Sequence, residues 1–413
     1  MEKINSYSAF YGKNVLIGVS GSIAAYKIPD LVRLFKKEGA NVKLILTKDA
    51  ANFVTPLTLS TLSSNKVFID FTNDLNNQWN NHVELALWAD VFLIAPATAN
   101  TISKMAHGLC DNILLATFLS SKCQVFCAPA MDRDMYLHRS TVKNLQILKK
   151  RGVYILDVES GELASGLHGL GRMRDITKLI NELEGFFLKD LLFYGKRILI
   201  TAGPTYEKID PVRFIGNFSS GKMGCELAKF AANQGAIVDL IIGPSYELVD
   251  HPLVNRVNIE TAHQMFTIVK EKFKYSDVAI FSAAVSDFKP LRFKRKKIKR
   301  KSLQINVEPN VDVLKTISST KKDQFIVGFA LETDNEDANA IKKMQEKNMD
   351  LVILNSLNDK EACFGYDTNK VKIIDHDLNI KTYPLMTKKE LASVILSEVF
   401  YRTKNASINS ILK

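Results

Sequence analysis

Short loops of glycine and hydroxyl-bearing residues are the first places in this sequence where phosphate chemistry could occur. They follow apolar runs and comprise the Ser20-Gly21-Ser22 turn, Thr47 and residues 96–101 (PATANT). Such residues at a helix N-terminus offer N–H and O–H donors to a phosphate. Neither GxGxxG nor GxxxxGK[ST] occurs, so the pattern suits a mononucleotide with one phosphate, such as FMN, better than a dinucleotide. Ordinary turn and helix-cap residues are the alternative explanation.

His82 is the titratable residue best placed for acid–base chemistry, because it stands just before the apolar run 91–95. Histidine is the natural base near neutral pH. The order His-x-Glu also occurs in zinc deaminases, but the Pro-Cys-x-x-Cys motif that completes their site is absent here. The other histidines are scattered and predict no metal cluster. A surface histidine at the start of a helix is the alternative interpretation of His82.

Two loops in the second half have related chemistry. Residues 201–205 (TAGPT) follow an apolar run, and residues 217–222 (NFSSGK) precede a helical pattern. The second loop follows the logic of a phosphate loop, since its hydroxyl groups, glycine and lysine would lie at a helix N-terminus. Lys297, which belongs to a basic tract further along the chain, is long enough to reach a triphosphate.

That basic tract accounts for most of the net positive charge. The 413 residues include 55 basic and 44 acidic ones, for a formal net charge of +11. Residues 292–301 (RFKRKKIKRK) hold eight of the basic residues, and without them 47 would face 44 acidic residues. The tract is a solvated loop or a nucleic-acid patch. Only Phe288 and Phe293 are aromatic nearby and they predict no stacking platform, so we expect no nucleic-acid partner.

These loops require elements that hold them at one edge of a sheet. Apolar runs at 14–20 and 42–47 predict strands on either side of a helix at 23–37, which makes a βαβ unit with parallel strands. The same order returns at 196–201, 221–233 and 237–242. Further strands are predicted at 91–95, 124–128, 278–282, 325–329 and 351–354. Because these runs are continuously apolar, we expect strands covered on both faces.

The pattern predicts an α/β fold with two Rossmann-like, doubly wound domains and largely parallel sheets. A helix at 176–189 makes a joint near residue 190, which gives domains 1–190 and 191–413. A length of 413 residues suggests about two to three domains. In open α/β sheets, ligands bind beyond the carboxyl ends of the strands, where the loops above would lie.

Composition indicates a soluble globular protein, with 46% hydrophobic and 24% charged residues. No stretch approaches the ~18 consecutive apolar residues of a membrane span, so we expect no membrane partner. The first apolar stretch is short and is broken by Gly and Ser, unlike a secretory signal. Five cysteines, at 110, 123, 127, 225 and 363, predict neither a disulfide framework nor a zinc site. We therefore expect a cytoplasmic protein with reduced thiols.

Taken together, these motifs resemble the bacterial bifunctional phosphopantothenoylcysteine decarboxylase/phosphopantothenate–cysteine ligase family of coenzyme A biosynthesis. The resemblance runs from about residue 13 to residue 399. The first half contributes SGSIAAYK, HVELALWAD, APATANTISKMAHGLCDN, PAMDRDMY and GLGRM. The second half contributes ITAGPTYEKIDPVRFIGNFSSGKMG, AAVSDF, KIKR and VGFALET. The long ITAGPT…GKMG stretch is highly specific.

The resemblance implies an FMN-dependent decarboxylase in the first half. FMN would be bound by Ser20, Gly21, Ser22, Thr47, Thr98 and Thr101. His82 matches the family's active-site histidine, and Met131 and Asp132 lie in its substrate motif. Asp132 replaces an Asn that commonly binds the substrate carboxylate, which an ionised Asp would repel. Ser165 replaces a flap Cys thought to return a proton to the enethiolate, and a hydroxyl is a far weaker acid than a thiol of pKa ~8.5.

For the second half the resemblance implies a CTP-dependent ligase. It would join 4′-phosphopantothenate to cysteine through an acyl cytidylate held by Asn217. Further substrate-binding positions would be Ala283, Asp287, Lys297, Asn310, Val311, Asp312, Val313, Phe329, Lys343 and Lys347. Mg2+ at Asp287 would neutralise the triphosphate, and the lysines would stabilise the leaving pyrophosphate electrostatically.

Three functions follow as alternatives. The first is a two-step enzyme that ligates 4′-phosphopantothenate and cysteine and then decarboxylates the product to 4′-phosphopantetheine. The second is an active ligase fused to a flavoprotein domain with impaired decarboxylase function. The third is a basic nucleic-acid-binding protein. The family also implies a homo-oligomer, with trimers of the flavin half and dimers of the ligase half.

Overall fold

The computed structural model describes residues 8–73, 78–189, 191–299, 304–359, 361–362 and 364–411. Cys363 and the end of the basic tract, Arg300 and Lys301, lie outside the described residues. The chain divides into two compact units, Met1–Asp190 and Leu191–Lys413, which we call the N-terminal and C-terminal units.

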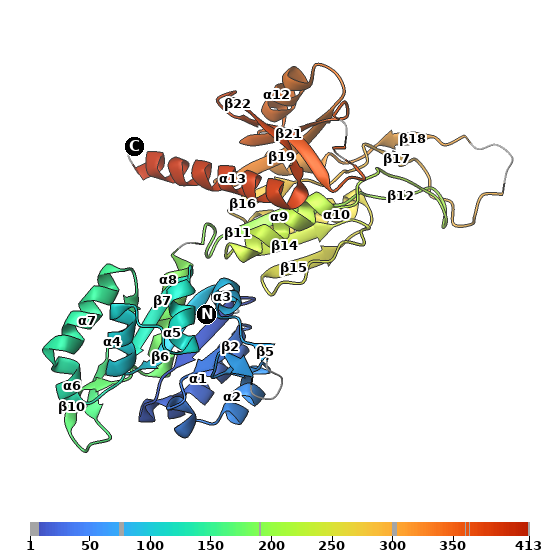
Figure 1. Cartoon of the computed structure of the whole chain (residues 1–413). Coiled ribbons are helices and arrows are strands. Elements are labelled where there is room, and N and C mark those ends of the chain that lie inside the picture. Colours follow the sequence, from blue (N-terminus) through green and yellow to red (C-terminus); the bar gives the residue numbers. More distant parts are fainter. Residues whose placement is uncertain are drawn as a thin grey trace. The chain divides into compact units, whose positions relative to one another are not determined.

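A six-stranded sheet forms the centre of the N-terminal unit, and every neighbouring pair of its strands is parallel (Figure 1). In spatial order the strands are β3 (Val67–Phe68), β2 (Asn41–Leu46), β1 (Asn14–Val19), β6 (Val91–Ala97), β7 (Gln124–Pro129) and β8 (Tyr154–Ile155). The four longer strands are almost entirely buried, which explains their continuous apolar runs.

Helices cover both faces of this sheet. One face packs against α1 (Ile28–Lys37), α2 (Pro56–Ser63) and α8 (Ile176–Leu188). The other packs against α3 (His82–Trp88), α4 (Ala99–His107), α5 (Ile113–Ser120) and α7 (Arg139–Lys150). Leu16 and Ile17, adjacent in β1, enter the cores on opposite faces, as the period of two in a strand requires.

The predicted helix 23–37 is divided in two. A 3-10 helix, η1 (Ile23–Lys27), comes first, and α1 begins at Ile28. Ser22 caps η1 by accepting a hydrogen bond from the backbone N–H of Ala24. Pro29 then lies in the first turn of α1, where its missing N–H costs nothing. The sequence pattern alone did not separate these two helices.

The C-terminal unit has an eight-stranded sheet. Six parallel strands lie in the order β15 (Val254–Asn258), β14 (Ile237–Ile242), β11 (Arg197–Ala202), β16 (Val278–Phe281), β19 (Phe325–Glu332) and β20 (Leu351–Ser356). Antiparallel β21 (Thr368–Asp375) and β22 (Ile380–Thr387) extend this sheet. Its helices are α9 (Lys222–Asn233), α10 (Ala262–Phe273), α11 (Val313–Ser318), α12 (Glu336–Glu346) and α13 (Lys388–Ile411).

The prediction of two doubly wound α/β folds with largely parallel sheets is confirmed. In both sheets the chain first builds strands outward on one side and then returns to the other side of its first strand. The direction of winding therefore changes between β1 and β6 in one unit and between β11 and β16 in the other. Crevices at such switch points are where open α/β sheets bind ligands.

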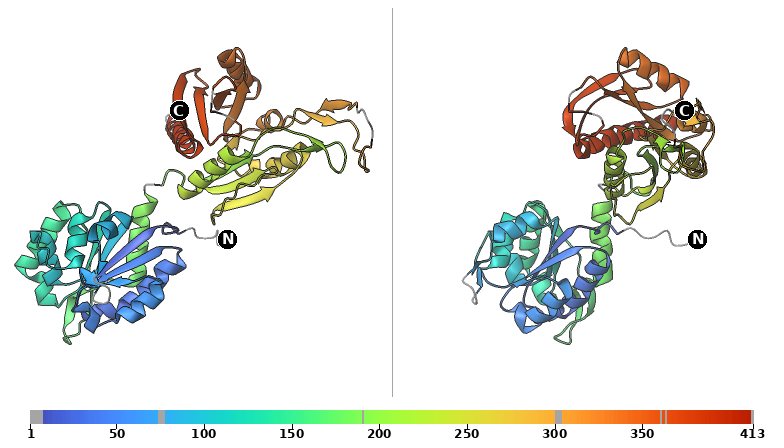
Figure 2. Two further views of the ribbon diagram at one scale, coloured as in Figure 1. Left: turned by 45° about the vertical axis from the view of Figure 1, so that its right-hand side comes forward. Right: turned by 90° about the vertical axis from the view of Figure 1, so that its right-hand side faces the viewer.

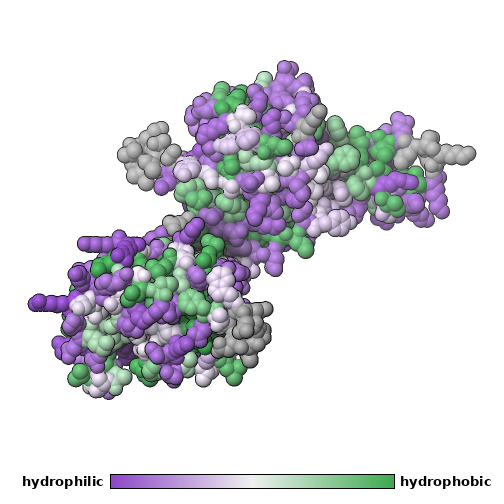
Figure 3. Space-filling model, viewed as in Figure 1, coloured by the Kyte–Doolittle hydropathy of each residue, from purple (hydrophilic) through white to green (hydrophobic). Residues whose placement is uncertain are grey.

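Two short hairpins extend the C-terminal unit into an arm (Figures 1 and 2). β12 (Glu207–Lys208) pairs with β13 (Phe214–Ile215), and β17 (Phe288–Pro290) pairs with β18 (Val307–Pro309). Hydrophobic residues gather on this arm, as the green areas of Figure 3 show. The exposed apolar side chains of its segments are Val212, Phe214, Phe288, Leu291, Phe293, Ile305 and Val307. The described part of the basic tract lies between β17 and β18.

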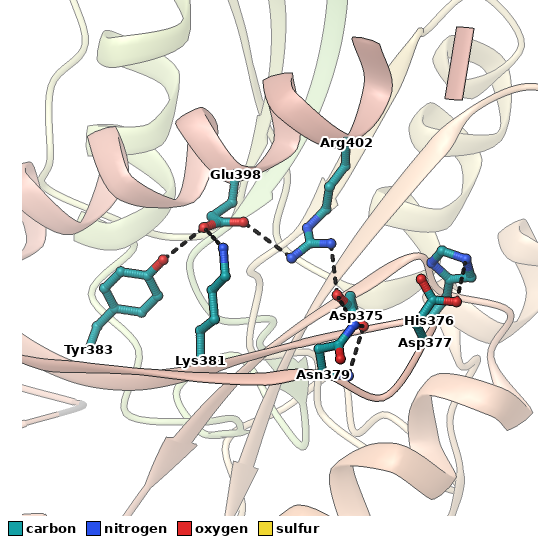
Figure 4. A network of polar contacts seen from close by, with 8 residues as sticks. All are labelled: Asp375, His376, Asp377, Asn379, Lys381, Tyr383, Glu398 and Arg402. Atoms are coloured by element: carbon teal, nitrogen blue, oxygen red, sulfur yellow. Dashed lines mark hydrogen bonds and ion pairs between the residues drawn. The ribbon is translucent and has the colours of Figure 1, made fainter. Parts of the chain in front are cut away.

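Polar contacts hold α13 to the β21–β22 hairpin (Figure 4). Glu398 accepts hydrogen bonds from Lys381 at 2.7 Å and from Tyr383 at 2.9 Å. Arg402 donates to Glu398 at 3.2 Å and to the buried Asp375 at 2.8 Å. Burial and the bond to Glu398 raise the pKa of Tyr383 to about 12. The network thus anchors the long helix α13. No described helix is both long and apolar enough to cross a bilayer.

Candidate functional site

A cavity of about 580 Å³ lies beyond the carboxyl ends of β1, β2 and β6, at the switch point of the N-terminal sheet. We call it the N-terminal cavity. Five of the six residues predicted to bind FMN line it: Gly21, Ser22, Thr47, Thr98 and Thr101. Three loops that are far apart in sequence thus meet here because their strands are neighbours and parallel.

Hydroxyl groups give this cavity its donors. Ser22 Oγ accepts a hydrogen bond from the N–H of Ala24, and Thr47 Oγ1 accepts one from Ala50, both at 3.3 Å. An oxygen that accepts in this way keeps its own O–H for a ligand. Thr98 caps α4 by accepting from the N–H of Thr101. The rim therefore suits an anion such as a phosphate.

Ser20, the sixth predicted residue, lies beneath the cavity. It is 1% exposed. Its hydroxyl donates to the carbonyl of Pro96 at 2.7 Å and accepts from the N–H of Thr98 at 3.0 Å. Both hydrogen-bonding roles of Ser20 are thus used inside the chain, where they tie the loop after β1 to the loop after β6.

A second cavity, of about 480 Å³, lies under the antiparallel hairpin β9 (Glu159–Glu162) and β10 (His168–Arg172). We call it the flap cavity. The predicted residues Met131, Asp132 and Ser165 line it. It shares Ser22, Ala130 and Met131 with the N-terminal cavity. The two spaces are thus adjacent, as a cofactor site and a substrate site must be.

The GLGRM motif brings the hairpin close to the loop after β7. Gly171 has φ +140°, and an added Cβ would lie 2.3 Å from the carbonyl oxygen of Met131. The N–H of Met131 donates to the carbonyl of Gly171 at 3.0 Å. A Cβ on Gly169 would lie 2.6 Å from Arg133 Cδ. Gly171 therefore permits a backbone approach that a side chain would block, whereas at Gly169 the Arg133 side chain would have to move.

His82 begins α3 and lies outside the residues that line both cavities. Its ring meets Phe71 edge to face, with ring centroids 6.0 Å apart, and Phe71 lines the N-terminal cavity. Nδ1 of His82 is buried and has no hydrogen-bond partner among the described residues. An unpartnered buried nitrogen is costly, so this ring nitrogen is a candidate to bond a ligand or a second copy of the chain.

The C-terminal unit has a cavity of about 330 Å³ at its own switch point. We call it the C-terminal cavity. Four predicted residues line it: Asn217, Ala283, Asp287 and Phe329. The NFSSGK loop contributes Ser219 to Lys222 as well. Lys222 stands at the start of α9 and pairs with Asp367, which raises the pKa of the lysine.

Six other residues that were predicted to bind ligase substrates lie outside the lining of this cavity. The Asn310 side chain donates to the carbonyl of Ser286 at 3.1 Å. Asp312 caps α11 and pairs with Lys347 at 2.9 Å, while Lys343 pairs with Glu332 at 2.7 Å. Val311 is half-buried and Val313 is buried. Both lysines already have carboxylate partners, so they would have to exchange those partners for a phosphate.

Lys297 lies exposed on the arm and does not line the C-terminal cavity. The arm is fixed next to it by Asp210, whose carboxylate accepts hydrogen bonds from the N–H groups of Val212, Arg213 and Ile298. Burial alone would raise the pKa of Asp210, but these bonds and the Arg213 guanidinium hold it at about 2. A buried, fully bonded carboxylate thus sets the position of the residue that follows Lys297.

Several residues that line these cavities were not predicted from the sequence. In the flap cavity these include Lys27 and Arg172. In the C-terminal cavity they include Asn355, Asn369 and Lys388. Asn355 Oδ1 is buried without a hydrogen-bond partner among the described residues. The SGSIAAYK and GLGRM motifs contain Lys27 and Arg172 and could have pointed to them, whereas nothing local marks the other three.

Comparison with known proteins assigns both units. Residues 4–188 match the Flavoprotein family model, and residues 193–402 match the model for the DNA/pantothenate metabolism flavoprotein C-terminal domain. The chain is therefore a flavoprotein of two joined family domains. It is 38% identical over 404 residues to the coenzyme A biosynthesis bifunctional protein CoaBC of Bacillus subtilis, covering 96% of this chain and 99% of that protein. The chain belongs to the CoaBC family.

The chain is also similar to two further proteins. A protein from an unknown prokaryotic organism, called cysteine/cysteine sulfinic acid decarboxylase, is 48% identical over 353 residues, covering 84% of this chain and 98% of that protein. The crystal structure of the C-terminal domain of a CoaBC protein is 40% identical and matches with a TM-score of 0.44, covering 52% of this chain and all of that domain.

Proposed function

We propose that the chain catalyses two consecutive steps of coenzyme A biosynthesis. The C-terminal unit condenses 4′-phosphopantothenate with cysteine at the expense of CTP. The N-terminal unit then decarboxylates phosphopantothenoylcysteine to 4′-phosphopantetheine with FMN. The observation that carries this proposal is the pair of cavities at the two switch points, in a chain that matches a CoaBC protein over 96% of its length.

FMN fits the N-terminal cavity on two observations. Ser22 and Thr47 keep O–H donors for a phosphate, and Gly21 lets the loop after β1 lie against Asp49, where a Cβ would come within 2.5 Å of Asp49 Cβ. The flavin supplies an electron sink, which a simple cysteine carboxylate lacks. Met131 and the flap hold the substrate next to it and shield it from water. His82 orients the reacting group or moves a proton.

In the C-terminal unit the substrate carboxylate displaces pyrophosphate from CTP, and the amine of cysteine then displaces CMP. Asn217 binds the acyl cytidylate; its amide now donates to the carbonyl of Ala284 at 3.1 Å. No group of three potential metal ligands occurs among the described residues. Asp287 would thus hold Mg2+ together with the phosphates, as is common for this ion. Lys297, Lys343 and Lys347 stabilise the leaving pyrophosphate.

A second candidate function concerns the N-terminal unit and rests on Asp132. Free cysteine carries an α-ammonium group, whereas the nitrogen of phosphopantothenoylcysteine is a neutral amide. A carboxylate in the flap cavity attracts the former. The relative called cysteine/cysteine sulfinic acid decarboxylase is consistent with such a substrate. On this candidate the unit decarboxylates the free amino acid, and Asp132 binds its ammonium group.

One incubation separates these functions. The purified chain is given 4′-phosphopantothenate, cysteine and CTP, and each product is identified by mass. We expect 4′-phosphopantetheine. Phosphopantothenoylcysteine that accumulates without CO2 would favour an impaired decarboxylase. Cysteamine formed from cysteine alone would favour the second candidate, and Asp132→Asn should then shift the preference back toward phosphopantothenoylcysteine.

We also propose that the chain acts in the cytoplasm as a homo-oligomer. The exposed apolar side chains on the arm support dimers of the ligase half, because patches of this kind mark interaction surfaces. Exposed Trp79, Val83 and Leu87 near His82 support trimers of the flavin half. Light scattering of the whole chain, and of variants with Phe288 or Leu87 changed to Asp, tests both contacts.

A further inference from the structure

A short piece of the basic tract is bonded to the rest of the arm at both of its ends. The N–H of Lys294 donates to the carbonyl of Ile209 at 3.0 Å. Further along, the N–H of Ile298 donates to the carboxylate of Asp210 at 3.1 Å. Ile209 and Asp210 are neighbours just after β12, so both attachments lie on the same turn of the arm. Lys297 immediately precedes the second attachment.

Ile298 is held through both of its backbone polar groups. The Arg213 guanidinium donates to the carbonyl of Ile298 at 3.2 Å and to Asp210 at 2.8 Å. Asp210 also accepts from the N–H groups of Val212 and Arg213 and is 1% exposed. Although burial raises its pKa, these bonds and the Arg213 charge hold that pKa at about 2. A buried and charged acceptor therefore fixes the backbone directly after Lys297.

This attachment separates Lys297 from the other basic residues of the tract. A cavity of about 920 Å³, which we call the arm cavity, is lined by the other described basic residues between 292 and 299: Arg292, Lys294, Arg295, Lys296 and Lys299. Lys297 does not line it, and its side chain is exposed. Lys343 and Lys347 pair with carboxylates, whereas Lys297 makes no ion pair among the residues that the structure describes. Its charge is thus available to a phosphate without an exchange of partners.

A lysine that stabilises a leaving pyrophosphate acts through its position. Electrostatic stabilisation is most effective when the charged group is in place before the new charge develops. A lysine side chain has many rotamers, and holding it in one of them costs entropy. A fixed backbone beside Lys297 limits the space that its ammonium group must search. A loose backbone there would lower the fraction of time that the group spends at the phosphates.

We propose that Asp210 is a positioning residue for Lys297 in the ligase reaction, because it holds the backbone of Ile298. The inference rests on the proposed function. Asp210 does not need to touch the nucleotide, since its buried oxygens are bonded to N–H groups of the arm. Its effect on the reaction passes through Lys297, and this dependence can be measured.

A double-mutant cycle measures it as pyrophosphate release from CTP and 4′-phosphopantothenate at saturating CTP, with the full chain. In Asp210→Asn one acceptor oxygen replaces two, so either the turn or Ile298 loses its bond. We expect release to be about tenfold slower, the cost of a misplaced group. In a chain that already carries Lys297→Ala, the same Asp210→Asn change should alter the rate by less than about twofold, because the residue that it positions is gone.

Glu207→Gln is the matched control. Glu207 is also a buried carboxylate of the arm, but its hydrogen bond, from the N–H of Ala262 at 2.8 Å, leads to α10 and not to the basic tract. Any loss in Glu207→Gln should be the same with and without Lys297→Ala.

Two outcomes of the cycle overturn the proposal. Release at the parent rate in Asp210→Asn would show that the attachment is not needed. An equal tenfold loss in the Lys297→Ala chain would show general damage to the arm. Absence of pyrophosphate from the parent chain would instead contradict the proposed function.

A second measurement uses the parent chain and needs no turnover. Hydrogen exchange of single backbone amides is followed by mass spectrometry with electron-transfer fragmentation. Among the described residues, the N–H of Lys297 has no hydrogen-bond partner, whereas that of Ile298 is bonded to Asp210. We expect the amide of Ile298 to exchange about tenfold more slowly than that of Lys297. Equal rates would overturn the proposal, even if Asp210→Asn failed to fold.

Discussion

The two units differ in how many of their predicted site residues line a cavity. In the N-terminal unit five of six predicted flavin-binding residues line one cavity. In the C-terminal unit four predicted residues line the cavity, whereas Lys297 lies on the arm and Lys343 and Lys347 pair with carboxylates. The first site consists of short side chains at strand ends, whose positions the sheet fixes. The second also depends on long side chains, whose ends the backbone does not fix.

We expect the largest effect from a change at His82. This residue is the predicted base, although it does not line either cavity of the N-terminal unit. We expect His82→Asn to lower CO2 release by about 1000-fold, because a group that moves or orients a proton is lost. FMN should remain bound, since the hydroxyl-rich rim is untouched. Stopped-flow detection of CO2 and the flavin spectrum measure both. Loss of flavin, or release at the parent rate, would contradict the assignment.

Lys297→Ala tests whether the arm serves the C-terminal site. Ligation should fall about 100-fold, as expected when one donor to a developing charge is removed. Decarboxylation of supplied phosphopantothenoylcysteine should stay unchanged, because that chemistry belongs to the other unit. Lys294→Ala is the matched control and should cost much less, since a solvated charge contributes little. An equal loss of both activities in a folded variant would refute the division of labour between the units.

Gly21→Ala tests the claim that the backbone fixes the N-terminal site. Its Cβ would lie 2.5 Å from Asp49 Cβ, and such overpacking costs ~1–3 kcal/mol, so FMN should bind about tenfold more weakly. Gly185→Ala, in α8 with nothing within 4 Å of the new Cβ, is the control and should leave binding intact. Fluorescence titration of flavin-free protein gives both affinities. Unchanged FMN binding in Gly21→Ala would show that the loop moves to accommodate the added methyl group, which would contradict the claim.

Asp210→Asn tests the anchor of the arm through pH. The folded-state pKa of Asp210, about 2, lies below the ordinary value of 3.8. The charged group therefore stabilises the fold above pH ~4, and this contribution is lost as pH falls from ~4 toward ~2. Asp210→Asn should lower the melting temperature by a few degrees at pH 7 and have little effect near pH 2. Asp323→Asn, at an exposed site, should change neither; a pH-independent loss would contradict the charge argument.

The fold could be predicted wherever a strand is a continuous apolar run. β14 (Ile237–Ile242) was predicted to the residue. β21 and β22 were not predicted, because alternating sequences such as TNKVKIID offer no continuous run. The flap hairpin was missed as strands for a similar reason: HGLGR is held by close approach of two glycines and not by apolar burial.

The residues of the candidate sites could also be predicted only in part. Hydroxyl and glycine residues after strands could be placed from sequence because parallel strands end at one edge. The ion pairs of Lys343 and Lys347 depend on Glu332 and Asp312, which come near only in the folded chain. Lys27 belongs to the SGSIAAYK motif, which could have pointed to it, but only the fold shows that it lines the flap cavity.

The smallest effect is expected at Ser165, a residue of the flap. Its hydroxyl is exposed and makes one long bond to Leu167. Because a serine hydroxyl is a poor proton donor, we expect Ser165 to do no more than hold a water or steady the flap. Ser165→Ala should then lower the yield of 4′-phosphopantetheine by about threefold, the contribution of one ordinary hydrogen bond. Ser165→Cys should keep or raise the yield, because a thiol is the stronger acid. A large loss in Ser165→Ala, with reduced flavin accumulating, would instead make Ser165 part of the proton transfer. No change at all would make Ser165 a flap residue without a chemical role.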